Sequence, residues 1–308
     1  MMETNYLADI LILLAAAIVA VPVFKRLGLG SVLGYLTAGA IVGPWGVGFI
    51  DEIEEIRHIA EFGVIFLLFI IGIELKPARL WAMRRIVFGL GTAQVLVTGL
   101  VITGIALLFE QSLRTAVIVG FGLALSSTAF GLQILTERNE LGTVHGQTAF
   151  SILLLQDLAV VPLLTLVSLL ATDTTLLEGI EFAILEAVLV IALVILAGRF
   201  FLSPILRLVA TSRTAEVFTA AAVFAVLGTA WLMEQVGLSL ALGAFLAGLM
   251  MSESHYRHQV IADIKPFRGI LLGLFFMGVG MSIDFGLLGS HAPLIAGLVL
   301  GLLLIKST

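Results

Sequence analysis

Residues 145–171, HGQTAFSILLLQDLAVVPLLTLVSLLA, form an apolar run that is long enough to cross a lipid bilayer. About 20 helical residues, each rising about 1.5 Å, span a hydrocarbon core roughly 30 Å thick. Gln156 and Asp157 lie in the middle of this run. Because an ionisable group at that depth costs about 3 kcal/mol on insertion scales, we expect Asp157 to have a function. A neutral, hydrogen-bonded structural aspartic acid is the alternative.

The composition also requires a membrane. Of the 308 residues, 60% are hydrophobic and only 12% are charged, which is more apolar surface than a soluble domain can cover. No polybasic cluster indicates nucleic-acid binding, and no HExxH, GxSxG or Walker motif indicates an enzyme. The absence of cysteine excludes disulfides and thiolate metal sites. We therefore expect an integral membrane protein, not an enzyme, with the lipid bilayer as its first partner.

Hydropathy predicts an all-α fold with about eleven transmembrane segments. The connections between them alternate in charge, and one set carries thirteen of the sixteen basic residues. By the positive-inside rule this set is cytoplasmic, which places the N-terminus outside. The predicted segments are 6–24, 30–47, 58–75, 86–109, 115–136, 146–171, 180–202, 215–233, 238–251, 267–283 and 292–308.

The fifth segment has a polar centre made of Ser126, Ser127 and Thr128, with glycines on both sides. Hydroxyl groups compete for backbone carbonyls, and glycine lowers the cost of leaving helical geometry. This pattern predicts a broken helix whose freed carbonyls and helix ends bind ions. An intact helix with hydroxyls bonded along it is the alternative.

Two further residues bear on Asp157. Pro162 has no N–H, so the carbonyl of Leu158 loses its helical partner and a kink is expected, with or without a ligand. Lys306 lies deep in the last apolar run and needs a counter-charge, a water cavity or a route to the interface. Asp157 is its natural partner, and an ordinary cationic helix end is the alternative.

Small residues recur in the second segment at intervals of four, as Gly30 and Gly34 and then as Gly39 and Gly43. Missing side chains at that spacing let helix backbones approach closely in lipid. We expect these glycines to serve helix packing.

Six stretches together resemble the Kef-type glutathione-gated potassium efflux transporters, within the cation:proton antiporters. LLLQDLA at 153–159 and GLFFMGVGMSIDFG at 273–286 are the specific motifs, whereas the glycine spacings alone are not. The resemblance covers nearly the whole chain. Its stretches are 26–46, 69–75, 123–139, 153–164, 236–250 and 264–286.

The resemblance implies a thirteen-helix fold of two inverted repeats with broken crossing helices, in which an ion-carrying core moves against a dimerisation domain. Residues 1–308 would form one membrane transport domain, with a first repeat over about 1–171, a linker helix over about 180–202 and an incomplete second repeat from about 213. The second broken helix, the thirteenth helix and the soluble nucleotide-binding regulatory domain of gated members are expected to be missing from this chain.

The same resemblance implies residue roles. Asp157 would be the exchanging carboxylate, Gln156 would bind or orient the cation, and Lys306 would balance the charge. Together with Asp157 and Gln156, the segment Ser126, Ser127 and Thr128 would hold the monovalent cation. His258 and Asp263 match the family's gating loop, although the family's acidic ESDIEPF reads IADIKPF here, so Ile261 and Lys265 replace carboxylates.

The resulting expectation is a secondary antiporter that exchanges K⁺, or alternatively Na⁺, for H⁺. A passive cation channel and a nonconducting membrane scaffold are further alternatives. No cofactor is expected in this chain, and nucleotide and glutathione would bind only through the missing regulatory domain. The resemblance implies a homodimer in a bacterial inner membrane, with a regulatory nucleotide-binding domain or an ancillary subunit as a further partner and no nucleic acid.

Overall fold

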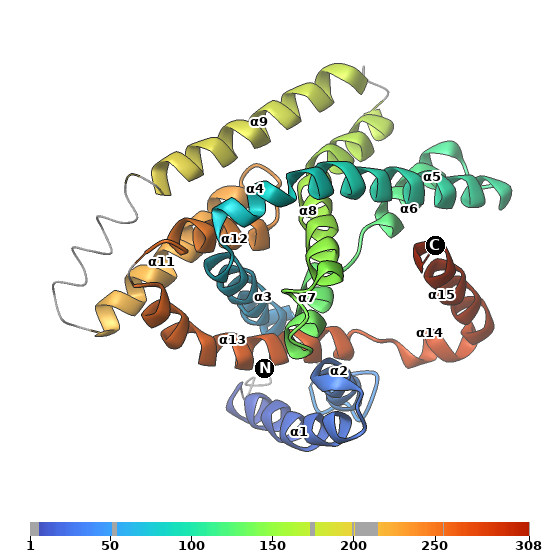
Figure 1. Ribbon diagram of the computed structural model, residues 1–308. Coiled ribbons are helices and arrows are strands. Elements are labelled where there is room, and N and C mark those ends of the chain that lie inside the picture. The colour runs from blue at the N-terminus through green and yellow to red at the C-terminus, as the bar shows by residue number, and fades with distance from the viewer. Residues whose placement is uncertain are drawn as a thin grey trace.

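A computed structural model describes residues 6–50, 54–172, 176–198, 200, 215–254 and 256–307, and contains helices, turns and loops but no strand over these ranges (Figure 1). The protein is therefore all-α, as predicted. The boundaries predicted near residues 202 and 213 lie outside the described residues. The helices are α1 (Tyr6–Arg26), α2 (Gly30–Val42), α3 (Glu54–Glu74), α4 (Pro77–Arg85), the π-helical turn η1 (Ile86–Gly91), α5 (Thr92–Leu108), α6 (Leu113–Ala124), α7 (Thr128–Glu137), α8 (Val144–Thr172), α9 (Leu176–Ala197), α11 (Ala215–Glu234), α12 (Leu240–Met251), α13 (Arg257–Met281), α14 (Phe285–Ser290) and α15 (Ala292–Ser307).

Each of the eleven predicted segments overlaps one helix or consecutive helices of this series. Within the described residues, six stretches of 19 to 32 residues are long and apolar enough to span a membrane, and three shorter apolar helices join them. Large apolar side chains also face outward, such as Ile18 on α1 and Leu304 on α15, which are 72% and 68% exposed. Side chains of this kind suit contact with lipid tails rather than water.

One prediction about a connection is wrong. The predicted spans 238–251 and 267–283 leave 252–266 as their connection, but α13 already begins at Arg257 and continues to Met281. Pro266 lies inside this helix rather than ending it. The polar residues of the stretch therefore occupy the first turns of a long helix. Helix α8 also continues on both sides of a proline, Pro162, and the kink expected there stays a prediction.

Helix α3 packs closely against α12 and α13 in the centre of the protein. Phe69 of α3 and Phe245 of α12 are completely buried or nearly so. A methyl group at Gly72 of α3 would collide with the backbone carbonyl of Phe245, and one at Gly248 of α12 would collide with that of Phe69. These helices approach so closely because glycines face each other across the seam.

The glycines predicted to pack do so in three of the four cases. Gly34 of α2 faces the backbone of Val21 on α1, and Gly39 faces the carbonyl of Met277 on α13. Gly43 contacts the next turn of α13, at Met281. The fourth, Gly30, instead begins α2 with φ +82°, a left-handed conformation that favours glycine.

The start of α2 is also joined to the end of α7. The Glu137 carboxylate accepts hydrogen bonds from the backbone N–H of Ser31, at 3.1 Å, and from the Ser31 hydroxyl. Gln133 of α7 donates a further bond to the same carboxylate, at 2.9 Å. A carboxylate at a helix N-terminus satisfies free N–H groups and complements the helix dipole. This contact ties α7 to α2.

Candidate functional site

The predicted break in the fifth span is present. Helix α6 ends at Ala124 and α7 begins at Thr128, and Leu125 and Ser127 between them have extended backbones, with ψ of 157° and 108°. The Ser127 hydroxyl accepts a hydrogen bond from the N–H of Phe130, at 3.3 Å, and so caps α7. The break frees carbonyl groups at the end of α6 and N–H groups at the start of α7, which are the groups that bind cations and anions respectively.

Asp157 of α8 lies beside the first residue of α7. The Thr128 hydroxyl donates a hydrogen bond to Asp157 Oδ1, at 3.1 Å. In the described part of the chain, no ion pair involves this carboxylate. The dipole of α7 favours a negative charge at its N-terminus, so Asp157 is held by a neutral donor and a helix end rather than by a basic side chain.

Gln156 is buried, with 2% of its surface exposed, and it braces the break. Its Oε1 accepts a hydrogen bond from the backbone N–H of Ser126, at 2.8 Å. Its Nε2 donates to the Ala124 carbonyl, at 3.4 Å, and to Gln94 Oε1, at 2.7 Å. Because the amide oxygen is already bonded to Ser126, this arrangement suits the orienting role predicted for Gln156 better than direct binding of a cation.

Lys306 reaches the same break from α15, but with different partners from the one predicted. Its Nζ donates to the carbonyls of Leu125, at 2.6 Å, and Leu123, at 3.0 Å, and no ion pair with Asp157 is found among the described residues. The break explains this choice, because carbonyls at the end of α6 lack helical N–H partners and are available to an ammonium group. Opposite charges therefore lie at the two ends of the break.

Gln94 belongs to this arrangement, and sequence reasoning misses it. Its Nε2 donates to the Ala124 carbonyl, at 3.2 Å, and to Thr98 Oγ1, at 3.3 Å, while its Oε1 accepts from Gln156. The available signal was an amide inside an otherwise apolar predicted span, 86–109.

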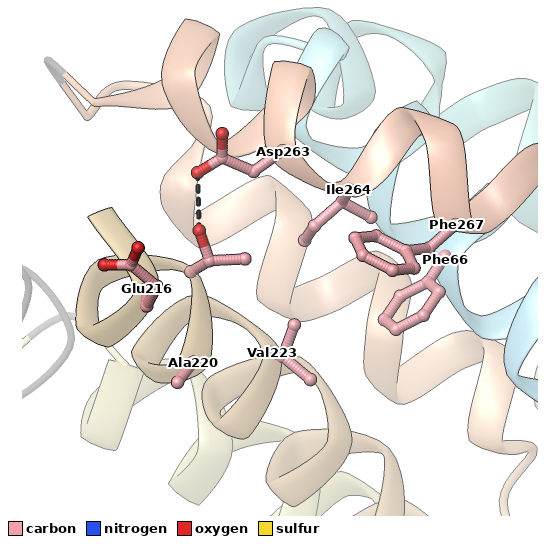
Figure 2. A pocket seen from close by; sticks show the side chains of 8 residues that line it. Phe66, Glu216, Ala220, Val223, Asp263, Ile264 and Phe267 are labelled. Atoms are coloured by element: carbon pink, nitrogen blue, oxygen red, sulfur yellow. Dashed lines mark hydrogen bonds between the residues drawn. The ribbon is translucent and has the colours of Figure 1, made fainter.

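The two residues matched to the gating loop lie elsewhere, on α13. Asp263 Oδ2 accepts a hydrogen bond from the Thr219 hydroxyl of α11, at 2.7 Å, beside a groove of about 620 Å³ between the two helices (Figure 2). Phe66, Val223 and Phe267 line the apolar part of this groove, and Glu216 lies at its polar side. His258 accepts a hydrogen bond from Arg257 on the surface, at 3.2 Å. His258 and Asp263 therefore lie on a different helix from those on either side of the break, α6 and α7.

The family model for the transmembrane sodium/hydrogen exchanger matches residues 11–308. The chain belongs to the sodium/hydrogen exchanger family. Its members are monovalent cation:proton antiporters of membranes. The match starts in α1 and runs into α15, so one family domain contains the helix break, Asp157 and Lys306. The exchanger is accordingly an integral membrane protein of a transporter family rather than of an enzyme family.

Proposed function

We propose that this exchanger moves a monovalent cation, K⁺ in preference to Na⁺, against H⁺ by competition at Asp157. The observation that supports this most is the carboxylate itself, which lies within a membrane-spanning helix beside the helix break and accepts one hydrogen bond from Thr128. The protonated carboxyl releases its proton to water as the cation binds, and the reverse exchange releases the cation. Because one negative charge holds either ion, the two fluxes are coupled.

The groups around the break have separate roles in this proposal. Ser126, Ser127 and Thr128 form the cation-binding segment, with the Thr128 hydroxyl on the carboxylate and Ser127 capping α7. Gln156 orients the backbone of the break. Lys306 supplies a positive charge that offsets Asp157 when no cation is bound, so that one-for-one exchange moves no net charge.

The finer assignment rests on sequence likeness. The motifs at 153–159 and 273–286 resemble the Kef-type potassium efflux transporters, which favours K⁺ over Na⁺, although the family match fits a Na⁺/H⁺ exchanger equally. By the same likeness we propose a homodimer in a bacterial inner membrane with its N-terminus outside. Ligand gating would act through His258 and Asp263, by means of a regulatory nucleotide-binding domain or an ancillary subunit that responds to glutathione.

The decisive experiment uses purified protein in proteoliposomes that contain a pH-sensitive dye. Addition of K⁺ or Na⁺ should move protons in the wild type, and the two cations compared at equal concentration give the selectivity. Asp157→Asn should abolish this movement. Asp284→Asn is the matched control, because Asp284 caps α14 through its side-chain oxygen and asparagine caps equally well.

Two outcomes would overturn the proposal. Full cation-dependent proton movement in Asp157→Asn would show that the carboxylate is not the exchanging group, as the scaffold alternative requires. Cation current that flows without any coupling to a pH gradient would indicate a channel.

A further inference from the structure

The π-helical turn η1 places Gln94 opposite Gln156. This turn ends at Gly91, whose Cα approaches α8 so closely that a methyl group there would lie 2.8 Å from the Leu155 side chain. The chain of α4, η1 and α5 crosses α8 at this point (Figure 1). Leu155 precedes Gln156, and Gln94 follows Gly91 by one helical turn. Single π turns inside α-helices are frequent at functional sites.

The orientation of the two amides is fixed by backbone groups that cannot change roles. The Ser126 N–H can only donate, so Gln156 must present its oxygen to it and turn its NH₂ group toward Gln94. The Ala124 carbonyl can only accept, so Gln94 must present its NH₂ group there and its oxygen to Gln156. The opposite orientation of either amide would place two donors or two acceptors together.

Ala124 and Ser126 are the residues on either side of Leu125, the first residue of the break. The carbonyl of Leu125 accepts the hydrogen bond from Lys306, and Thr128 a little further along holds Asp157. The two amides therefore fix the short segment that connects the positive and the negative group of the site.

We infer that Gln94 is a positioning residue for exchange, which holds the Gln156 amide so that the backbone of the helix break keeps the geometry the cation requires. This inference rests on the proposed function. Among the hydrogen bonds of the described residues, none joins Gln94 to the exchanging carboxylate, and Gln94 acts through Gln156 and the Ala124 carbonyl. Its loss should weaken cation binding while leaving the proton-exchanging group in place.

The first test is Gln94→Leu, which keeps the size of the side chain and removes its hydrogen bonds. In the proteoliposome assay it should raise the apparent KM for K⁺ about tenfold and change kcat less than twofold, since Asp157 is untouched. Thr98→Val is the matched control, because it removes only the 3.3 Å contact of Gln94 with Thr98 and should behave like the wild type. An unchanged KM in folded Gln94→Leu protein would overturn the inference.

The second test is Gln94→Glu, measured against the wild type at each pH. An ionised glutamate accepts from Gln156 but cannot donate to the Ala124 carbonyl, whereas a protonated one does both. The KM ratio of variant to wild type should therefore approach one at low pH and rise as the pH increases. A KM ratio that stays constant with pH would contradict a hydrogen-bonding role for Gln94. This test remains valid even if the Gln94→Leu protein does not fold.

A double-mutant cycle with Gln156→Leu completes the design. If the two residues act as one unit, the free-energy changes calculated from the KM values of Gln94→Leu and Gln156→Leu should sum to clearly more than the change in the double mutant. Strictly additive free-energy changes would refute the pairing. The experiments distinguish a failure of the proposed function from a failure of this inference. Exchange retained by Asp157→Asn would refute the proposed function. Wild-type exchange in the Gln94 variants, together with an inactive Asp157→Asn, would refute only the role of Gln94.

Discussion

Replacement of Lys306 by methionine tests whether the ammonium group stabilises the helix break. Methionine matches the unbranched apolar stem of lysine but lacks the ammonium group. The change therefore removes two hydrogen bonds, to Leu125 O at 2.6 Å and to Leu123 O at 3.0 Å. A hydrogen bond that involves a charged group contributes about 1.5–3 kcal/mol when it is buried. Lys306 is only partly buried, and water screens its charge, so we expect a loss of about 2 kcal/mol for the two bonds together.

A loss of that size is measurable by thermal unfolding. For domains of about 150–250 residues, 1 kcal/mol shifts the Tm by about 2–4 °C, and the shift is smaller in a longer chain such as this one, so Lys306→Met should unfold about 4 °C below the wild type in detergent. The intrinsic tryptophans, three in the chain, provide the fluorescence signal. Lys306→Arg, which keeps the charge and the donors, should lose much less.

The matched control is Lys265→Met, because Lys265 is an exposed lysine on α13. Its replacement should leave the Tm unchanged within about 1 °C, as is usual for isolated surface substitutions. Unfolding of Lys306→Met at the wild-type temperature, or an equal decrease in Tm for both methionine variants, would show that the ammonium group does not stabilise the helix break.

The remaining predictions concern the other end of the break and the glycine seam. Thr128→Val removes the donor to Asp157 and should raise the apparent KM for the cation about fivefold in the proteoliposome assay. Thr128→Ser keeps the hydroxyl, so its apparent KM should stay within about twofold of the wild-type value. Equal effects of the two substitutions would refute the role of this hydrogen bond. Gly39→Ala should lower the free energy of unfolding by about 1–3 kcal/mol, because its methyl group collides with the backbone of Met277. Gly104→Ala on α5, where open space surrounds the position, should be neutral or slightly stabilising in the same unfolding assay, and a similar loss at both glycines would argue against close packing at Gly39.

The sequence was sufficient for features that depend on local chemistry. The apolar runs predicted the helices, and the three hydroxyl residues among glycines predicted the break between α6 and α7. The intervals of four residues from Gly30 to Gly34 and from Gly39 to Gly43 predicted close helix contacts, because a missing side chain is itself the cause of the approach. Gly34, Gly39 and Gly43 make such contacts, whereas Gly30 does not.

Features that depend on tertiary placement could not be predicted in this way. Lys306 donates to carbonyls of α6 rather than to Asp157, and that choice depends on where α15 meets the break. The pairing of Gln94 with Gln156 depends on where the chain of η1 and α5 crosses α8, which the sequence does not specify. The continuation of α13 from Arg257 through Pro266 likewise contradicts the connection expected over 252–266.

The bond between Glu137 and Ser31 gives the broken helix an anchor at its far end. Helix α7 carries Thr128 at one end and Glu137 at the other, and Glu137 is fastened to the first turn of α2. If α7 moves with Asp157 during transport while α2 stays with its neighbours α1 and α13, each transport cycle must break these hydrogen bonds and later form them again. The anchor would then stabilise one of the two conformations, so the free energy of these hydrogen bonds sets how long the exchanger remains in that conformation.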